Sequence, residues 1–260
     1  MTTENIAELL AINLWMVLFL VTLCMLLLAW LLWYGLQRYF LRRPGSQVLL
    51  SVAVAIVASV GFVGIADEIG LDDDLGQFDV ALSDALSQHA SDEQLRIFAV
   101  LTDLGDKKFL TPLAVLVFAL MLFRRRWVLA ASWAVATAGG GLLNVALKTL
   151  FERSRPEHLH GFATADGWSF PSGHASGACI VYGLLAYLLV INTASRWHLP
   201  VAVVAMALIV CVGFSRVILQ VHYLSDVLGG FAFGAAWVAA WIAALEVFRR
   251  RQQATGTDNS

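Results

Sequence analysis

The stretch QVLLSVAVAIVASVGFVGI, residues 47–65, decides the fold class, because it contains no charged residue from its first position to its last. An α-helix of about 20 apolar residues spans the hydrocarbon core of a bilayer, which is roughly 30 Å thick. Inside that core every backbone N–H and C=O must be hydrogen-bonded within the protein, and a helix achieves this within one segment. Residues 47–65 therefore predict a transmembrane helix.

Similar runs recur along the chain, which is 59% hydrophobic and 14% charged, whereas soluble domains are about 25% charged. The sequence therefore predicts an all-α fold, a polytopic transmembrane helix bundle with about seven crossings. We expect an N-terminal transmembrane helix and basic inner loop (1–46), a core (47–247) and a polar C-terminal tail (248–260). The other apolar runs are 9–36, 106–123, 127–147, 174–192, 199–215 and 226–247.

The charges between these runs predict an orientation. If the N-terminus lies outside, the inner connections hold ten of the 17 Lys and Arg residues, and every acidic residue except Glu246 and Asp258 lies outside. Inner loops of membrane proteins are rich in Lys and Arg, so we expect an outer N-terminus and an inner C-terminus. The ten inner cations are Arg38, Arg42, Arg43, Arg124, Arg125, Arg126, Arg196, Arg249, Arg250 and Arg251.

The outer segment and the net charge add two expectations. Residues 67–106 are acidic, carry a capping-box pattern at Ser91 and Gln94, and should form short helices on the membrane surface. The formal net charge is −2, and no basic tract interleaved with aromatic residues is visible. This composition argues against nucleic acid as a partner.

Three polar stretches lie at the ends of apolar runs, and the expected topology places all three at the outer face. They are KTLFERSRP at 148–156, FPSGHASG at 170–177 and SRVILQVHYLSD at 215–226. The second should begin a helix with Ser172 as its N-cap, and the free N–H groups of that helix would favour an anion. In the third, His222 and Asp226 would share one face if the segment were helical, because they are four residues apart.

Together these stretches supply the groups needed for phosphoryl transfer through a covalent histidine intermediate. Cations can stabilise the charge on the phosphoryl oxygens, and we assign Lys148, Arg155 and Arg216 to that task. The carboxylate of Asp226 would hold one ring nitrogen of His222 so that the other attacks phosphorus. The second histidine, His174, would protonate the leaving oxygen and later accept a proton from water.

Each residue taken singly also fits a structural role. Lys148 could be a snorkelling residue at a helix end, and Ser172 a simple cap. We interpret Arg153 as a partner of lipid headgroups or of Glu152, and His158 and His160 as solvated loop residues. Only the convergence of the three stretches favours catalysis.

The stretches resemble the three-part signature of the type 2 phosphatidic acid phosphatase superfamily of membrane lipid phosphatases. That signature is Lys, six residues, Arg-Pro; then Pro-Ser-Gly-His; then Ser-Arg, five residues, His, three residues, Asp. Every fixed position matches, over a resemblance that covers roughly 47–247. The matching positions are Lys148, Arg155, Pro156, Pro171, Ser172, Gly173, His174, Ser215, Arg216, His222 and Asp226.

The resemblance implies a six-helix core and a role for each matching polar position. Phosphate would be held by Lys148, Arg155, Ser172, Gly173 and Arg216; His174 would be the acid, His222 the nucleophile and Asp226 its orienter. The family needs no metal or other cofactor, which agrees with the lack of a convincing ligand cluster in the sequence. The run 9–36 departs from the family pattern as an apparent extra transmembrane helix.

The resemblance leads us to expect a lipid phosphatase at the outer face of a bacterial-type plasma membrane, surrounded by membrane lipids. Its substrate would be a lipid phosphate: a polyprenyl pyrophosphate, phosphatidate, phosphatidylglycerol phosphate or the phosphate of an outer-membrane lipid. A phosphotransferase with the same site remains an alternative. A vanadate-dependent peroxidase uses a similar signature, but seven apolar runs argue against that soluble class. A non-catalytic transporter or scaffold that recognises an anionic lipid is disfavoured, because His222 and Asp226 are both present. Protein partners are not specified by the sequence.

Overall fold

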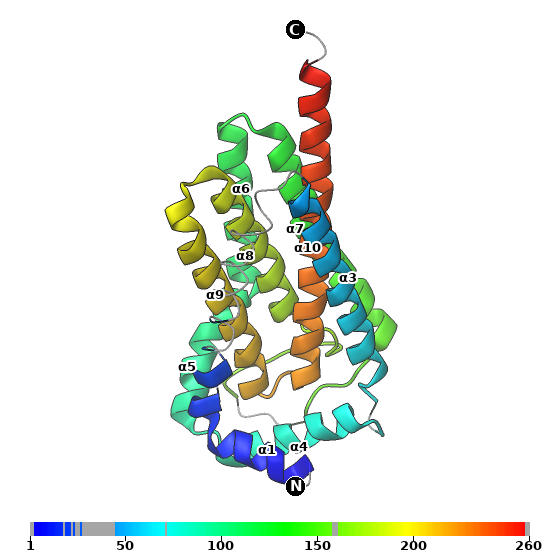
Figure 1. The fold of residues 1–260 in the computed structure, drawn as a ribbon. Helices are drawn as coiled ribbons and strands as arrows, with labels where there is room; N and C mark the ends of the chain where they lie inside the picture. Colours follow the sequence, from blue (N-terminus) through cyan, green and yellow to red (C-terminus); the bar gives the residue numbers. More distant parts are fainter. Residues whose placement is uncertain are drawn as a thin grey trace.

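The computed structural model describes residues 3–17, 19–21, 23, 27, 45–70, 72–157 and 161–257. Figure 1 shows a bundle of long helices with shorter helices across one end. The long helices are α3 (Ser46–Asp67), α6 (Lys107–Phe123), α7 (Trp127–Phe151), α8 (Gly173–Asn192), α9 (His198–Ile218) and α10 (Leu224–Thr257). The short helices are α1 (Thr3–Ile12), α4 (Asp74–His89) and α5 (Asp92–Thr102), with 3-10 turns at Asp103–Gly105 and Ser195–Trp197.

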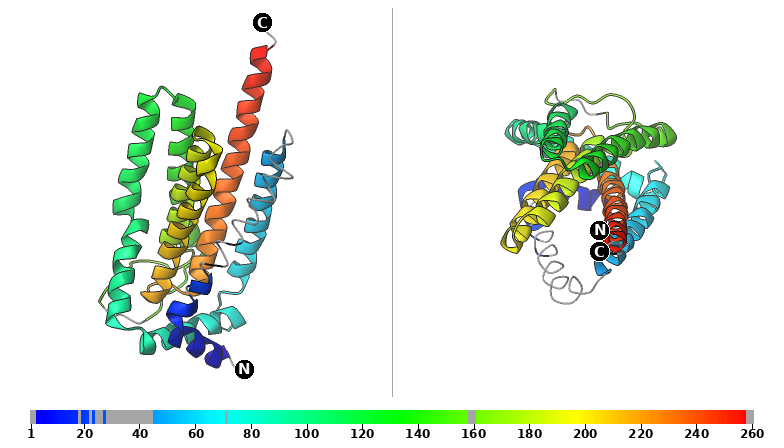
Figure 2. Two further views of the ribbon diagram at one scale, coloured as in Figure 1. Left: turned by 60° about the vertical axis from the view of Figure 1, so that its left-hand side comes forward. Right: turned by 90° about the horizontal axis from the view of Figure 1, so that it is seen from above.

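The predicted all-α transmembrane bundle is confirmed. Within the described residues, five helical segments are long and apolar enough to cross a membrane: Ser46–Asp67, Trp127–Phe151, Gly173–Asn192, Ser195–Ile218 and Leu224–Gln252. The 17-residue α6 runs beside them (Figure 2). These six helices correspond to six of the seven apolar runs in the sequence.

The first apolar run, where the sequence predicts an extra transmembrane helix at 9–36, is described only in its first part, which contains a sharp bend. Residues Thr3–Ile12 form α1, and the helical segment Leu14–Val21 is turned from it by 89°. α1 packs on α4 at the lower end of the bundle (Figure 2), where Ala7 and Ala11 are buried with Leu82 and Leu86. Residues 28–44, which hold most of the expected helix and its basic loop, lie outside the described residues, as do His158 and His160.

The chain alternates direction, so its connections divide between the two ends of the bundle. Three connections lie at the lower end in Figure 1: the one between α3 and α6, the one between α7 and α8, and the one between α9 and α10. The short α6–α7 and α8–α9 connections lie at the opposite end, which is also the C-terminal end. The three polar stretches therefore meet at one end, as the sequence predicts.

Local capping fixes the helix starts that matter for this end. Ser91 and Gln94 form the predicted capping box of α5, and the side chain of Asp106 caps α6 by accepting the Lys108 N–H at 2.8 Å. The Ser172 hydroxyl caps α8 and accepts the Ala175 N–H at 3.4 Å. These caps satisfy backbone donors that a helix start leaves free.

α10 lies between α3 and α8 and is the longest helix of the described chain. It extends to Thr257, beyond the boundary expected at 247, so residues 248–257 of the predicted polar tail continue the helix. Glycines allow α10 to approach α8 closely: a Cβ at Gly230 would lie 2.8 Å from the Ser172 carbonyl oxygen, and one at Gly234 would lie 2.6 Å from the Cys179 Cβ. This approach holds the start of α8 against α10.

Candidate active site

A cavity of about 740 Å³ opens at the lower end of the bundle, between α6, α7 and α8. Six of the predicted site residues line it: Lys148, Arg155, Gly173, His174, Arg216 and His222. Apolar lining continues from this polar end along α6 to Phe118 and along α7 to Trp133. The cavity thus joins a cationic floor to an apolar groove.

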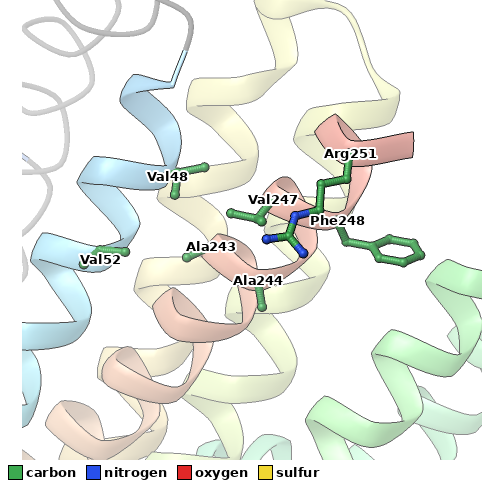
Figure 3. Close-up of a pocket in the computed structure, with 7 residues that line it drawn as sticks. All are labelled: Val48, Val52, Ala243, Ala244, Val247, Phe248 and Arg251. Atoms are coloured by element: carbon green, nitrogen blue, oxygen red, sulfur yellow. The ribbon is translucent and has the colours of Figure 1, made fainter. Parts of the chain in front are cut away.

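A second, shallower hollow lies at the other end of the molecule, between α3 and α10 (Figure 3). Its lining is apolar except for Arg251, and it contains none of the predicted site residues. Chemistry that needs a nucleophile and several cations therefore belongs to the larger cavity.

His222 and Asp226 form a buried pair, with His222 Nδ1 3.2 Å from Asp226 Oδ2. The pair does not lie on one helical face, as the sequence spacing suggested, because α9 ends at Ile218 and α10 begins at Leu224. His222 lies in the turn between them, where its N–H donates to the Arg216 carbonyl at 3.3 Å. The Tyr223 N–H also donates to Asp226 Oδ2, at 3.0 Å, so the carboxylate binds both ring and turn.

The surroundings of His222 favour a neutral ring whose Nε2 lone pair faces Arg155. Burial lowers the pKa of His222 well below its usual range, and the nearby charges of Arg155 and Arg216 lower it further. We assign the ring proton to Nδ1, because the Asp226 carboxylate is an acceptor only. Nε2 then accepts from Arg155 Nη1, 3.1 Å away, and His222 lines the cavity as a nucleophile should.

Arg155 and Lys148 are anchored by the loop between α7 and α8. Arg155 donates to the carbonyl oxygens of Gly167 at 2.8 Å and Val221 at 2.6 Å. The Lys148 Nζ donates to the Ser169 carbonyl at 2.9 Å. These bonds place two cations beside the imidazole.

Arg216 reaches the cavity from the last turn of α9. Its Nη1 donates to Thr102 Oγ1 at 2.8 Å, while its buried Nε has no hydrogen-bond partner within the described part of the chain. A buried guanidinium N–H is costly to leave unpaired. An anion with several acceptor oxygens would satisfy it.

The Pro-Ser-Gly-His stretch supplies the remaining predicted residues. Ser172 is fully buried behind the cavity, where its N–H donates to the Asp226 carbonyl at 2.9 Å. Gly173 lines the cavity at the start of α8. His174 Nε2 lies 3.6 Å from Asp106 Oδ2, so a carboxylate that the sequence interpretation missed faces the candidate acid.

The interpretation of Arg153 as a partner of Glu152 or lipid headgroups is wrong. Its guanidinium is buried, with Nη1 2.7 Å from Asp226 Oδ1 and Nη2 2.8 Å from Asp79 Oδ2. The only hint in the sequence was the position of Arg153 inside the first polar stretch. Nothing in the α4 sequence connects Asp79 with residues more than 70 positions away.

Among the described residues, no group of three or more His, Cys, Asp and Glu side chains is arranged to hold a metal ion. The candidate site brings together a His–Asp pair, a second histidine and several cations at one end of a transmembrane bundle. Such an arrangement defines a class of polytopic membrane proteins that handle phosphate esters at the bilayer surface.

Comparison with known proteins assigns the family. The family model of the PAP2 superfamily matches residues 127–250. The structure resembles the crystal structure of a transmembrane PAP2-type phosphatidylglycerolphosphate phosphatase from Bacillus subtilis, with a TM-score of 0.68, 31% identity, and coverage of 76% of this chain and 96% of that one. The chain belongs to the PAP2 superfamily, as its three motifs predicted.

Three proteins of similar sequence are named as phosphatases. Phosphatidylglycerophosphatase B of Bacillus subtilis is 39% identical over 136 residues, which is 52% of this chain and 66% of that protein. A lipid A 1-phosphatase of Rhizobium johnstonii is 38% identical over 36% of this chain and 39% of its own length. A decaprenylphosphoryl-5-phosphoribose phosphatase of Mycobacterium tuberculosis is 38% identical over 45% and 61%. The matches thus cover about two fifths to two thirds of these relatives, whose names share the word phosphatase and differ in the lipid.

Proposed function

We propose that this protein is a membrane lipid phosphatase that hydrolyses a phosphate or pyrophosphate monoester of a lipid through a phosphohistidine intermediate. The observation that carries the proposal is the buried His222–Asp226 pair at the floor of a cavity with an apolar extension. The second ring nitrogen of His222, Nε2, lies 3.1 Å from Arg155 Nη1. The family and the names of the relatives support the same activity.

The first half of the reaction transfers the phosphoryl group to His222. The Nε2 lone pair attacks phosphorus while the bond from phosphorus to the leaving oxygen breaks, and His174 donates a proton to that oxygen. Arg155, Lys148 and Arg216 balance the charge on the other phosphoryl oxygens. Asp226 stabilises the positive charge that the ring acquires when it is phosphorylated.

The second half releases phosphate. His174, now neutral, accepts a proton from water, and the resulting hydroxide attacks phosphorus as the P–N bond breaks. The electron pair of that bond returns to His222 Nε2, which restores the neutral ring. His174 leaves this half-reaction protonated and ready for the next substrate.

The apolar groove supports an amphiphilic substrate. From Lys148 to Trp133 the lining of α7 spans 15 residues, or about 22 Å of helix, and α6 supplies the facing wall. A headgroup phosphate on the cationic floor would leave the hydrocarbon tail in this groove, level with the bilayer. Polyprenyl pyrophosphate, phosphatidate and phosphatidylglycerol phosphate all meet that description.

We place the site at the outer face of a bacterial plasma membrane. The Arg residues at 124–126, 196 and 249–251 lie at the end of the bundle opposite the cavity, and such Arg-rich ends face the cytoplasm. The C-terminus would then be cytoplasmic.

The test is phosphate release by the purified protein in detergent, with those three lipids as substrates and a metal chelator present throughout. His222→Ala should abolish release, whereas His89→Ala, at an exposed histidine on α4, should leave it unchanged. Equal release by the His222 variant would exclude the proposed nucleophile. Release that requires an added acceptor alcohol would show a phosphotransferase instead.

A further inference from the structure

A buried chain of charges connects the candidate catalytic pair with the surface helix α4. Asp226 Oδ2 lies 3.2 Å from His222 Nδ1, and Asp226 Oδ1 lies 2.7 Å from Arg153 Nη1. Arg153 Nη2 lies 2.8 Å from Asp79 Oδ2. Asp79 Oδ1 also accepts the Ser225 N–H at 3.1 Å, and the Ser225 hydroxyl binds both Asp79 and Arg153. The residues that form this chain of charges are all buried.

The charges of Asp226, Arg153 and Asp79 do not cancel. One guanidinium lies between two carboxylates, so the group of three keeps one negative charge. If Asp79 were neutral, Arg153 would pair with Asp226 alone and cancel the charge that His222 faces. Burial raises the pKa of the Asp79 carboxyl, and the bonds from Ser225 and Arg153 offset only part of that rise. Asp79 Oδ2 nevertheless lies 2.8 Å from Arg153 Nη2, within ion-pair distance. Asp79 thus draws part of the guanidinium charge away from Asp226.

The geometry points to a positioning role beyond the three motifs: we propose that Asp79, acting through Arg153, holds the Asp226 carboxylate in the orientation and charge state that His222 requires. The proposal rests on the proposed function, because it assigns a new residue to that site. Asp79 is not one of the residues that line the cavity, and its side chain is bonded to Arg153 and Ser225, so we expect it to act through these neighbours.

The position of Asp79 in the fold gives this role a structural basis. α4 packs on α1 on one side and contacts the start of α10 on the other, and Asp79 is 1% exposed on the side toward Ser225. The arginine is fixed further by the Tyr223 ring, whose centroid lies 4.6 Å from the guanidinium carbon. A rigid arginine transmits the position of α4 to the catalytic carboxylate.

The experiment compares Asp79→Asn, which keeps the shape and removes the charge, with Asp84→Asn at an exposed site on the same helix. Rates are normalised to the folded fraction from size-exclusion chromatography in detergent. We expect Asp79→Asn to lower kcat by about tenfold or more, which is the usual effect of losing a residue that orients a ligand or catalytic group from behind. KM should change by less than about twofold, because no contact with the substrate is removed. Asp84→Asn should match the wild type.

A double variant separates positioning from folding. Asp79→Asn combined with Arg153→Met removes one negative and one positive charge, so the group keeps the net charge of −1 that it has in the wild type. The Asp226 carboxylate is still bonded to the Tyr223 N–H and to His222 in this variant. A positioning role predicts that kcat stays low in this folded variant. Wild-type kcat in the double variant would overturn the proposal. If the double variant does not fold, Ser225→Ala decides: a lowered kcat with unchanged KM supports the proposal, and an unchanged kcat overturns it.

A spectroscopic readout makes the proposal independent of activity. The proton on His222 Nδ1, identified by its loss in His222→Ala, should give a low-field NMR signal because it is bonded to a carboxylate. Asp79→Asn should shift this signal, and Asp84→Asn should not. An unchanged signal in Asp79→Asn would overturn the proposal. Failure of the wild type to release phosphate from any lipid would instead overturn the proposed function, and the NMR comparison would still decide the positioning role.

Discussion

The close approach of α10 to the start of α8 makes Gly230→Ala an informative perturbation. The added methyl group would lie 2.8 Å from the Ser172 carbonyl oxygen and 2.9 Å from the Ala175 Cβ, about 0.6 Å and 0.5 Å short of the 3.4 Å at which ordinary contact begins. One of these neighbours is backbone, so a side-chain rotation cannot relieve the contact. The start of α8, with Gly173 and His174, must move away from α10.

Two magnitudes show which measurement is decisive. Overpacking costs about 1–3 kcal/mol, but alanine is favoured over glycine within a helix by about 1 kcal/mol, so the net loss of stability can be small. Displacing catalytic groups by up to 1 Å can lower the rate by about 100-fold. We therefore expect kcat/KM for lipid phosphate to fall by about 10- to 100-fold, with a modest decrease in Tm.

The assay is phosphate release in detergent alongside thermal unfolding of the same preparation. Gly64→Ala is the matched control, because a Cβ at Gly64 on α3 meets nothing within 4 Å. Wild-type kcat/KM in Gly230→Ala would refute the argument that the α8–α10 approach positions the site. An equal loss in Gly64→Ala would show that the effect is not specific to that contact.

Four further predictions address the pair, its ionisation, the groove and the topology. Asp226→Asn should lower kcat by about 100-fold or more, because the amide no longer stabilises the charged ring; a loss confined to KM would contradict the assigned role. Since folding lowers the pKa of His222 by burial, the unfolded chain binds a proton first on acidification. Stability should therefore fall below about pH 6.5, by up to about 1.4 kcal/mol per pH unit, and the fall should be smaller in His222→Asn, as measured by unfolding at several pH values. Ala138→Trp should obstruct the apolar groove and lower hydrolysis of a long-chain lipid phosphate without affecting a short soluble ester; equal losses for both would argue against the groove as the tail site. Among single-cysteine variants, Thr164→Cys should react with a membrane-impermeant reagent added from outside and Arg125→Cys should not; the reverse pattern would invert the proposed orientation.

Much of the fold could be predicted from the sequence because its determinants are local. The run at 47–65 became α3 at Ser46–Asp67, and the hydroxyl of Ser172 caps α8 as expected. Hydrophobic length and capping involve neighbours within one or two turns of helix. A reader of the sequence can therefore find these elements without knowing how they pack.

Two features that the sequence did not reveal depend on packing. The first apolar run begins with α1 on the lower end of the bundle, because α4 offers a surface on which Ala7 and Ala11 can be buried. His222 lies outside the helix that contains Asp226, since the chain turns sharply at Gln220, with φ of 51°. The α9–α10 packing selects that turn, which residue spacing alone does not reveal.

The sequence by itself determined the class of protein, because the apolar runs predict membrane-spanning helices whose ends meet at one face. It also named the six residues that line the cavity, because the motifs contain the groups that phosphate chemistry needs. Only the tertiary structure decided that Arg153 forms an ion pair with Asp226 and a second one with Asp79. Those contacts join residues 73 and 74 positions apart. The physical reason is that a charge buried in a protein must be paired, and which partner is within reach depends on how distant segments pack.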